Sequence, residues 1–219
     1  MIRCAIFDMD GLMFDTELLF LRAMQEYVGP ETGVEFPTEN ILKLLGCNQK
    51  DFDRLFPILF GTAITPQKCT ELVTFWMRRE IETHGMPTKP GLYALLDALK
   101  AKGFRLALAT GTSRPIALAY LEQTHTRHYF DTIVCGDQVR RGKPDPEIFE
   151  TAFRLLGGGD PKTCVVFEDS PNGLKAAHAA GFLEICVPDM IDPTPQLSFT
   201  PFAKLASLDE AIPLLCEER

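Results

Sequence analysis

Residues 2–11 read Ile-Arg-Cys-Ala-Ile-Phe-Asp-Met-Asp-Gly, and the interpretation of the whole chain starts from this stretch. Its first part, Ile2–Phe7, is mostly apolar at consecutive positions, which is typical of a strand buried on both faces of a parallel sheet. Asp8 and Asp10 then end the apolar run, and Gly11 lets the chain turn and brings backbone amides close to an anion. Because aspartate and glycine are also common at ordinary strand ends, this stretch alone does not decide between a turn and a site.

Four further apolar runs have the same character, and helical segments separate them. The expected strands are Phe104–Ala109, Thr132–Cys135, Thr163–Phe167 and Leu183–Val187. Leucines at helical spacing or a proline at the first helical turn indicate the helices. These helices are expected at Gly91–Lys102, Pro115–Gln123, Pro146–Leu156 and Pro171–Ala180. The alternation predicts an α/β fold with a Rossmann-like, doubly wound parallel sheet.

Residues 16–86 interrupt this rhythm, because they contain no convincing strand. Phe20–Val28 has apolar residues at helical spacing, and Glu71–Thr83 is a second expected helix. We therefore expect an inserted α-helical domain at 16–86, with 1–15 and 87–219 forming the core.

Composition limits the classes of partner. Twenty-two basic and thirty acidic side chains give a formal charge of −8, which disfavours nucleic acid and anionic lipid as partners. The seven cysteines are scattered without CxxC spacing, as expected in a reducing compartment. We find no signal peptide and no apolar run near the ~20 residues of a membrane span. These features predict a cytoplasmic protein with a small-molecule partner, and we expect it to be a monomer.

Three more signals follow later strands. Thr110 and Gly111 place a hydroxyl and a flexible backbone after the second strand, where they can hold phosphate oxygens. Lys143 lies in the stiff loop Gly-Lys-Pro-Asp-Pro, which can direct one ammonium group at a charged centre. Glu168 and Asp169 are adjacent carboxylates at the end of another strand. Each signal alone also suits a helix cap or a solvated surface residue.

Together these signals are more specific, because the carboxyl ends of parallel strands meet at one edge of a sheet and ligands bind there. Four carboxylates at that edge repel one another unless a cation offsets them, and one lysine is not enough. Mg²⁺ favours sites that combine a few carboxylates with substrate phosphate, so the pattern indicates phosphoryl transfer. The residues expected to converge are Asp8, Asp10, Thr110, Lys143, Glu168 and Asp169.

The motifs FDMDG, ATGTS, GKPDP and FEDSPNG occur in this order over essentially the whole chain. In these motifs the chain resembles the haloacid dehalogenase (HAD) superfamily, in its phosphatase and β-phosphoglucomutase-like branch with a helical cap. The resemblance implies that Asp8 is the nucleophile that accepts phosphate. It implies that Asp10 protonates the leaving oxygen and then activates water, while Thr110 and Lys143 hold the phosphate.

The resemblance also implies a Mg²⁺ cofactor. Asp8, the backbone carbonyl of Asp10 and Asp169 are its expected ligands, with Glu168 in or beside that shell. Residues expected to contact the substrate are Gly111, Thr16, Asn48 and Gln49.

Two comparisons separate functions within the superfamily. Its dehalogenases lack the second aspartate of the first motif and use no Mg²⁺, whereas Asp10 is present here. β-Phosphoglucomutase carries a cap histidine and a cap arginine where Phe20 and Gln49 stand here. The resemblance therefore favours a Mg²⁺-dependent phosphatase of a small organic phosphomonoester, a sugar phosphate or a nucleotide. A mutase that returns phosphate to its substrate is one alternative. A non-catalytic phosphate-binding protein is another, although the pairing of Asp8 with Asp10 argues against it.

Overall fold

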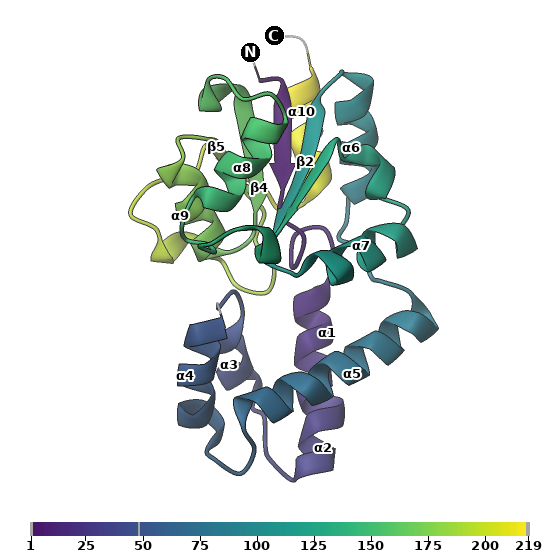
Figure 1. The fold of residues 1–219 in the computed structure, drawn as a ribbon, viewed down its shortest axis with the longest axis vertical. Helices are drawn as coiled ribbons and strands as arrows, with labels where there is room; N and C mark the ends of the chain where they lie inside the picture. The colour runs from purple at the N-terminus through teal and green to yellow at the C-terminus, as the bar shows by residue number, and fades with distance from the viewer. Residues whose placement is uncertain (1, 48, 218–219) are drawn as a thin grey trace. The chain divides into compact units, whose positions relative to one another are not determined.

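Six parallel strands form one sheet in the order β3-β2-β1-β4-β5-β6 (Figure 1), in a computed structural model that describes residues 2–47 and 49–217. The strands are β1 (Cys4–Phe7), β2 (Arg105–Thr110), β3 (Thr132–Cys135), β4 (Cys164–Glu168), β5 (Leu183–Cys186) and β6 (Ala203–Lys204). The five expected strands are present: β3 has the expected bounds, and the ends of the others differ from expectation by at most two residues. Strand β6 was not predicted, because its two residues are too few to form a recognisable sequence pattern.

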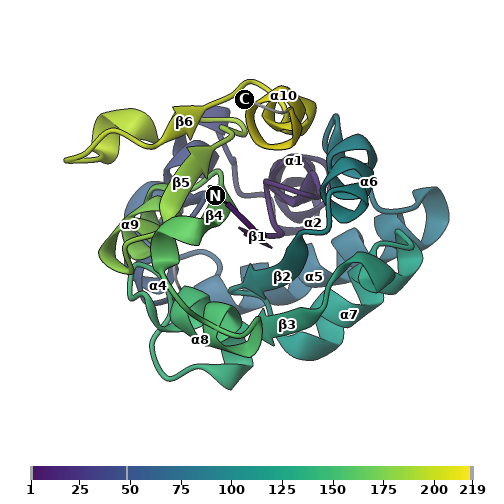
Figure 2. The same cartoon turned by 90° about the horizontal axis from the view of Figure 1, so that it is seen from above.

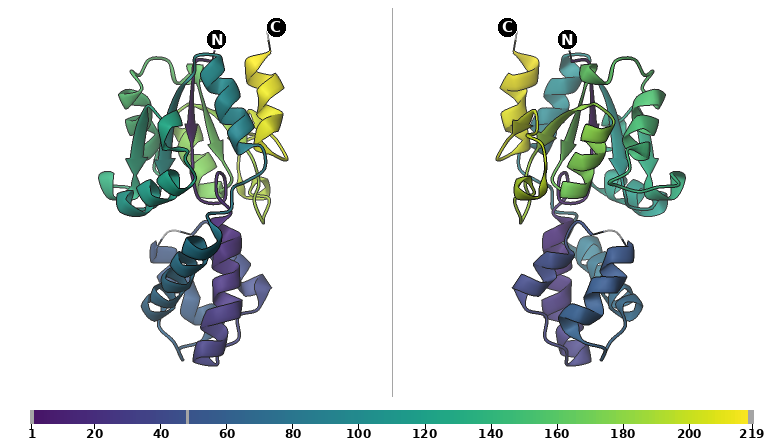
Figure 3. Two further views of the ribbon diagram at one scale, coloured as in Figure 1. Left: turned by 90° about the vertical axis from the view of Figure 1, so that its right-hand side faces the viewer. Right: turned by 90° about the vertical axis from the view of Figure 1, so that its left-hand side faces the viewer.

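Helices cover both faces of this sheet, as expected for a doubly wound fold. They are α6 (Leu92–Ala101), α7 (Arg114–Gln123), α8 (Glu147–Leu155), α9 (Pro171–Ala179) and α10 (Ala211–Cys216). α8 and α9 lie on one face, and α6 and α10 pack together on the other (Figures 2 and 3). Short 3₁₀ turns complete the connections at η3 (Arg127–Tyr129), η4 (Gly136–Gln138), η5 (Pro161–Thr163), η6 (Thr194–Gln196) and η7 (Leu208–Glu210).

The central strand β1 is buried on both faces, which explains its run of consecutive apolar residues. Ile6 belongs to the core cluster formed with Phe149 and Phe153 of α8. Phe7 points the other way, because side chains alternate along a strand. Its ring stacks on that of Phe167 with centroids 4.6 Å apart. Packing from both sides holds the end of β1 in place.

The register of the sheet brings three strand ends to one edge. Phe7 of β1 pairs with both Leu108 of β2 and Phe167 of β4. In the sheet, β2 and β3 lie on one side of β1, and β4, β5 and β6 lie on the other. In such sheets ligands bind where the strand order reverses, just beyond the carboxyl ends of these strands.

The chain divides into two compact units, of which one contains the sheet and the other is Asp15–Pro87. The second unit is helical: α1 (Thr16–Arg22), the π-helical η1 (Ala23–Val28), α2 (Gly29–Thr32), α3 (Thr38–Ile41), η2 (Leu42–Leu44), α4 (Gln49–Phe60) and α5 (Pro66–His84). It has its own apolar core, in which the fully buried Phe56 contacts the rings of Phe52 and Phe60. Across the described residues of both units, no helix is both long and apolar enough to cross a membrane.

Candidate active site

Asp8 is the first residue after β1 and is only 7% exposed. Its backbone N–H donates to the carbonyl of Phe167 at 3.1 Å, which continues the pairing of β1 with β4. Lys143 reaches the Asp8 carboxylate from the loop between β3 and α8. Its Nζ donates to Asp8 Oδ1 at 2.6 Å and to Glu168 Oε1 at 2.5 Å. One ammonium group therefore joins carboxylates from the ends of two neighbouring strands.

Glu168 is the last residue of β4, and its side chain is fully buried. Its Oε2 accepts hydrogen bonds from the backbone N–H and the hydroxyl of Ser170, both at 2.9 Å. The same hydroxyl accepts from the Gly173 N–H at 3.0 Å and so caps α9. A Cβ atom on Gly173 would overlap the Glu168 carboxylate. Within the motif FEDSPNG, Ser170 therefore holds the Glu168 carboxylate while capping α9, and the absence of a side chain at Gly173 leaves room for that carboxylate.

Asp10 receives its hydrogen bonds from the end of β2. Its Oδ2 accepts from the hydroxyls of Thr110 at 3.2 Å and Thr112 at 2.6 Å. The Thr110 hydroxyl also accepts from the Thr112 N–H at 3.0 Å, which fixes the two threonines relative to each other. No hydrogen bond from the described part of the chain reaches Asp10 Oδ1. Thr112 was not among the predicted site residues, although it lies in the motif ATGTS.

Asp169 completes a cluster of buried carboxylates. Asp8, Glu168 and Asp169 each offer a carboxylate oxygen, and these oxygens lie within 4.8 Å of one another. A Cβ atom on Gly11 would overlap Asp169 Oδ2, and the φ of Gly11 is +75°, so this turn needs glycine for two reasons. A set of hard oxygen ligands around a small space fits Mg²⁺. Among the described residues, the side chain of Asp10 is not part of this cluster.

The electrostatics of the cluster also favour a cation. Burial raises the pKa of Asp8 to about 7; the charges of Glu168 and Asp10 add to this rise, and that of Lys143 opposes it. Burial alone would lower the pKa of Lys143, but Asp8 and Glu168 more than offset this effect and raise it above its ordinary value. Lys143 therefore stays charged, and its single positive charge is shared by several buried carboxylates. A divalent cation would supply the missing positive charge.

The other residues expected to contact substrate have different surroundings. Gly111 is exposed just after β2, and the space where its Cβ would lie is open, so a ligand can approach its backbone. Thr16 is buried at the start of α1. Gln49 is exposed at the start of α4, where its Nε2 donates to Asp53 Oδ1 at 2.8 Å. Asn48 lies outside the described residues. Their contact with a substrate stays a prediction.

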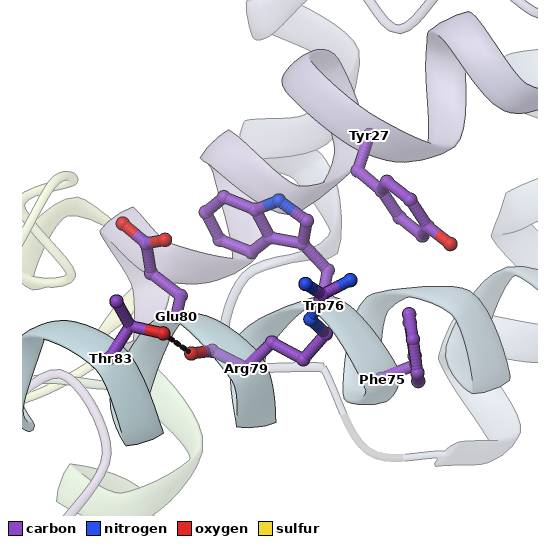
Figure 4. Close-up of a pocket in the computed structure, with 6 residues that line it drawn as sticks. All are labelled: Tyr27, Phe75, Trp76, Arg79, Glu80 and Thr83. Atoms are coloured by element: carbon purple, nitrogen blue, oxygen red, sulfur yellow. Dashed lines mark hydrogen bonds between the residues drawn. The ribbon is translucent and has the colours of Figure 1, made fainter.

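The helical unit contains a cavity of about 290 Å³ between η1 and α5 (Figure 4). Aromatic and polar side chains share its wall, and the Arg79 guanidinium lies 5.7 Å from the ring centroid of Phe75. Of the expected substrate residues that the structure describes, Gly111, Thr16 and Gln49, none lines it. The lining residues are Tyr27, Phe75, Trp76, Arg79, Glu80 and Thr83.

Comparison with known proteins agrees with the motifs and the fold. The family model for haloacid dehalogenase-like hydrolases matches residues 2–181. The phosphorylated carbohydrates phosphatase of Thermotoga maritima is 34% identical over 188 residues, which cover 84% of this chain and 83% of that protein. The fructose-1-phosphate phosphatase YqaB of Escherichia coli is 33% identical over 190 residues, with coverage of 80% and 91%.

Solved structures of related proteins also share this fold. CbbY from Rhodobacter sphaeroides, in complex with phosphate, has a TM-score of 0.77 and 28% identity, and the match covers 96% of each chain. The expected Rossmann-like core and the expected enzyme class are both confirmed. The chain belongs to the haloacid dehalogenase-like hydrolase family and is an enzyme of that family.

Proposed function

We propose that this protein is a Mg²⁺-dependent phosphatase that hydrolyses a small organic phosphomonoester through phosphoryl transfer to Asp8. The observation that carries the proposal is the position of Lys143, whose ammonium group is held between Asp8 and Glu168 beside Asp169. This arrangement combines a buried nucleophile, a fixed positive charge and ligands for a metal ion. Relatives named for phosphorylated carbohydrates and fructose 1-phosphate support a sugar phosphate as the substrate class.

The first step in this mechanism is attack of the Asp8 carboxylate on the phosphorus atom. The bond between phosphorus and the ester oxygen breaks, and the departing oxygen takes a proton from Asp10. Lys143 offsets negative charge on Asp8 and the transferred group. Thr110 and Thr112 hold Oδ2 of Asp10, which leaves Oδ1 to exchange the proton. In the second step Asp10 takes a proton from water, the water oxygen bonds to phosphorus, and free phosphate leaves Asp8.

The residues that would hold Mg²⁺ are Asp8, Asp169 and the backbone carbonyl of Asp10, with Glu168 beside them. When bound, the ion neutralises negative charge shared by these carboxylates and the substrate phosphate. The donor set fits this role because its oxygens are close together and buried.

We expect the helical unit, predicted at 16–86, to determine which substrate the enzyme accepts. The expected contacts with the substrate come from Thr16 and from the turn before Gln49. Substrate choice in one fold commonly changes with such variable segments while the chemistry stays the same. We also expect the enzyme to act as a monomer in the cytoplasm, where its cysteines, all free in the structure, stay as thiols.

The test is a panel of sugar phosphates, nucleotides and an aryl phosphate, assayed for released phosphate with Mg²⁺ and with EDTA. We expect turnover with Mg²⁺ only. Asp8→Asn should lower it by several orders of magnitude, because the amide keeps the shape but cannot accept phosphate. Asp97→Asn, at an exposed position of α6, is the matched control and should keep wild-type activity.

Two results would overturn the proposal in favour of its alternatives. Conversion of a sugar phosphate into its isomer, with activation by a sugar bisphosphate and little released phosphate, would identify a mutase. Phosphate binding without turnover on any member of the panel would identify a binding protein.

A further inference from the structure

A further carboxylate, that of Asp189, lies at the same edge of the sheet, in the loop after β5. Its side chain is only 5% exposed. One oxygen, Oδ1, forms an ion pair with Lys89. The other, Oδ2, is buried and receives no hydrogen bond within residues 2–47 and 49–217. A buried carboxylate oxygen without a donor is costly, so a donor from a bound molecule is expected at this position.

Asp189 Oδ2 faces the metal cluster. A Cβ atom on Gly11 would lie 3.3 Å from Asp189 Oδ2 and would also overlap Asp169 Oδ2, so both oxygens border the same small space. Carboxylate oxygens of Asp169 and Asp189 lie within 4.8 Å of each other. One water molecule spans a gap of this size and can donate to a carboxylate across it.

Lys89 fixes the orientation of Asp189. Its backbone N–H donates to the Met13 carbonyl at 2.9 Å, next to the bridge between Phe14 and Thr88. The lysine side chain is 18% exposed, so most of this ion pair is shielded from water. Since Oδ1 is held by Lys89, Oδ2 is directed at the space beside Gly11.

We propose that Asp189 is a positioning residue of the metal site, whose Oδ2 accepts a hydrogen bond from a water molecule bound to the Mg²⁺ ion. The inference rests on the proposed function, in which Asp8 and Asp169 bind that ion. Mg²⁺ usually keeps several of its waters in proteins, and partners beyond the direct ligands orient the shell and strengthen binding. The charges agree in sign, because the carboxylates of Asp8, Glu168, Asp169 and Asp189 outnumber the ammonium groups of Lys143 and Lys89, and Asp10 adds a further negative charge beside Asp8.

The experiment is a calorimetric titration of Mg²⁺ into the EDTA-treated protein without substrate, together with the Mg²⁺-dependent rise of the melting temperature. Asp189→Asn and Asp189→Ala should each weaken Mg²⁺ binding about 10- to 100-fold, the usual effect of losing such a partner. The alanine variant excludes compensation by an amide oxygen. Asp192→Asn is the matched control, because Asp192 lies in the same loop and pairs with Lys204, but it is 43% exposed. Its Mg²⁺ affinity should stay within about twofold of wild type.

Lys89→Met separates this role from a structural one. It removes the ion pair but keeps the Asp189 carboxylate and its charge near the ion, so Mg²⁺ affinity should fall clearly less than in Asp189→Asn, because only the orientation of the carboxylate is loosened. Equal weakening by Lys89→Met and Asp189→Asn would overturn the inference and make Asp189 only the partner of Lys89. Wild-type affinity in both Asp189 variants would also overturn it while leaving the proposed phosphatase intact. A wild-type protein that binds no Mg²⁺ would instead overturn the proposed function, on which the inference rests.

Discussion

Replacing Lys143 by methionine tests the electrostatic account of the site most directly. Methionine keeps much of the length of the side chain but removes the ammonium group that bonds to Asp8 at 2.6 Å and to Glu168 at 2.5 Å. The side chains of these three residues are 12%, 10% and 0% exposed, so water cannot replace the lost bonds. Removing one partner from a buried ion pair costs about 3–5 kcal/mol. For a protein of this size, that corresponds to a fall in the melting temperature of roughly 6–20 °C.

The same account predicts that Mg²⁺ reverses part of this loss. The destabilisation arises from carboxylates left without a counter-charge, and a divalent cation supplies one. Urea unfolding in EDTA should show the full loss in Lys143→Met, and saturating Mg²⁺ should reduce it. Lys68→Met is the matched control: its ion pair with Glu71 is 3.5 Å long and more than half exposed. Its effect on the free energy of unfolding should be at most about 1 kcal/mol in either buffer.

A Lys143→Met protein as stable as the wild type in EDTA would refute the idea that the ammonium group balances buried charge. A large loss that is identical with and without Mg²⁺ would show that the variant fails through packing, since Lys143 also lies 4.8 Å from the ring centroid of Phe149.

Three further predictions concern the acid, the substrate contact and pH. Asp10→Ala should lower kcat more for a sugar phosphate than for an aryl phosphate, because only the poor leaving group needs a proton; equal losses would make Asp10 structural. Gln49→Ala should lower kcat/KM by about 1–3 kcal/mol for the sugar phosphate and leave the aryl phosphate unchanged; no selective loss would place specificity elsewhere. Mg²⁺ affinity should fall up to tenfold per unit as pH drops below about 7, because a proton on Asp8, whose pKa burial raises to about 7, must leave before the metal binds. Calorimetry at pH 5.5 to 8.5 measures this dependence, and a flat profile would contradict it.

The local pattern of the sequence was enough to find the strands that build the site. Ile2–Phe7 and Thr163–Phe167 are apolar at nearly every position, because β1 and β4 are covered by helices on both faces. The pattern could not find β6, which pairs through two residues at the edge of the sheet. The motifs also predicted that polar groups gather at one edge, since parallel strands in such a fold end together.

The sequence by itself determined the fold class, the family and the identity of the main polar groups, because these depend on residue type, short spacing and the order of motifs. Only the tertiary structure decided which groups touch. Asp10 bonds to Thr112 across 102 residues of sequence, and Lys89 pairs with Asp189 across 100. Such contacts depend on the strand order β2-β1-β4-β5 and on where each loop returns to the sheet edge, and neither is encoded in any local stretch. The buried Oδ2 of Asp189 became visible for the same physical reason: whether a polar atom lacks a donor depends on everything packed around it.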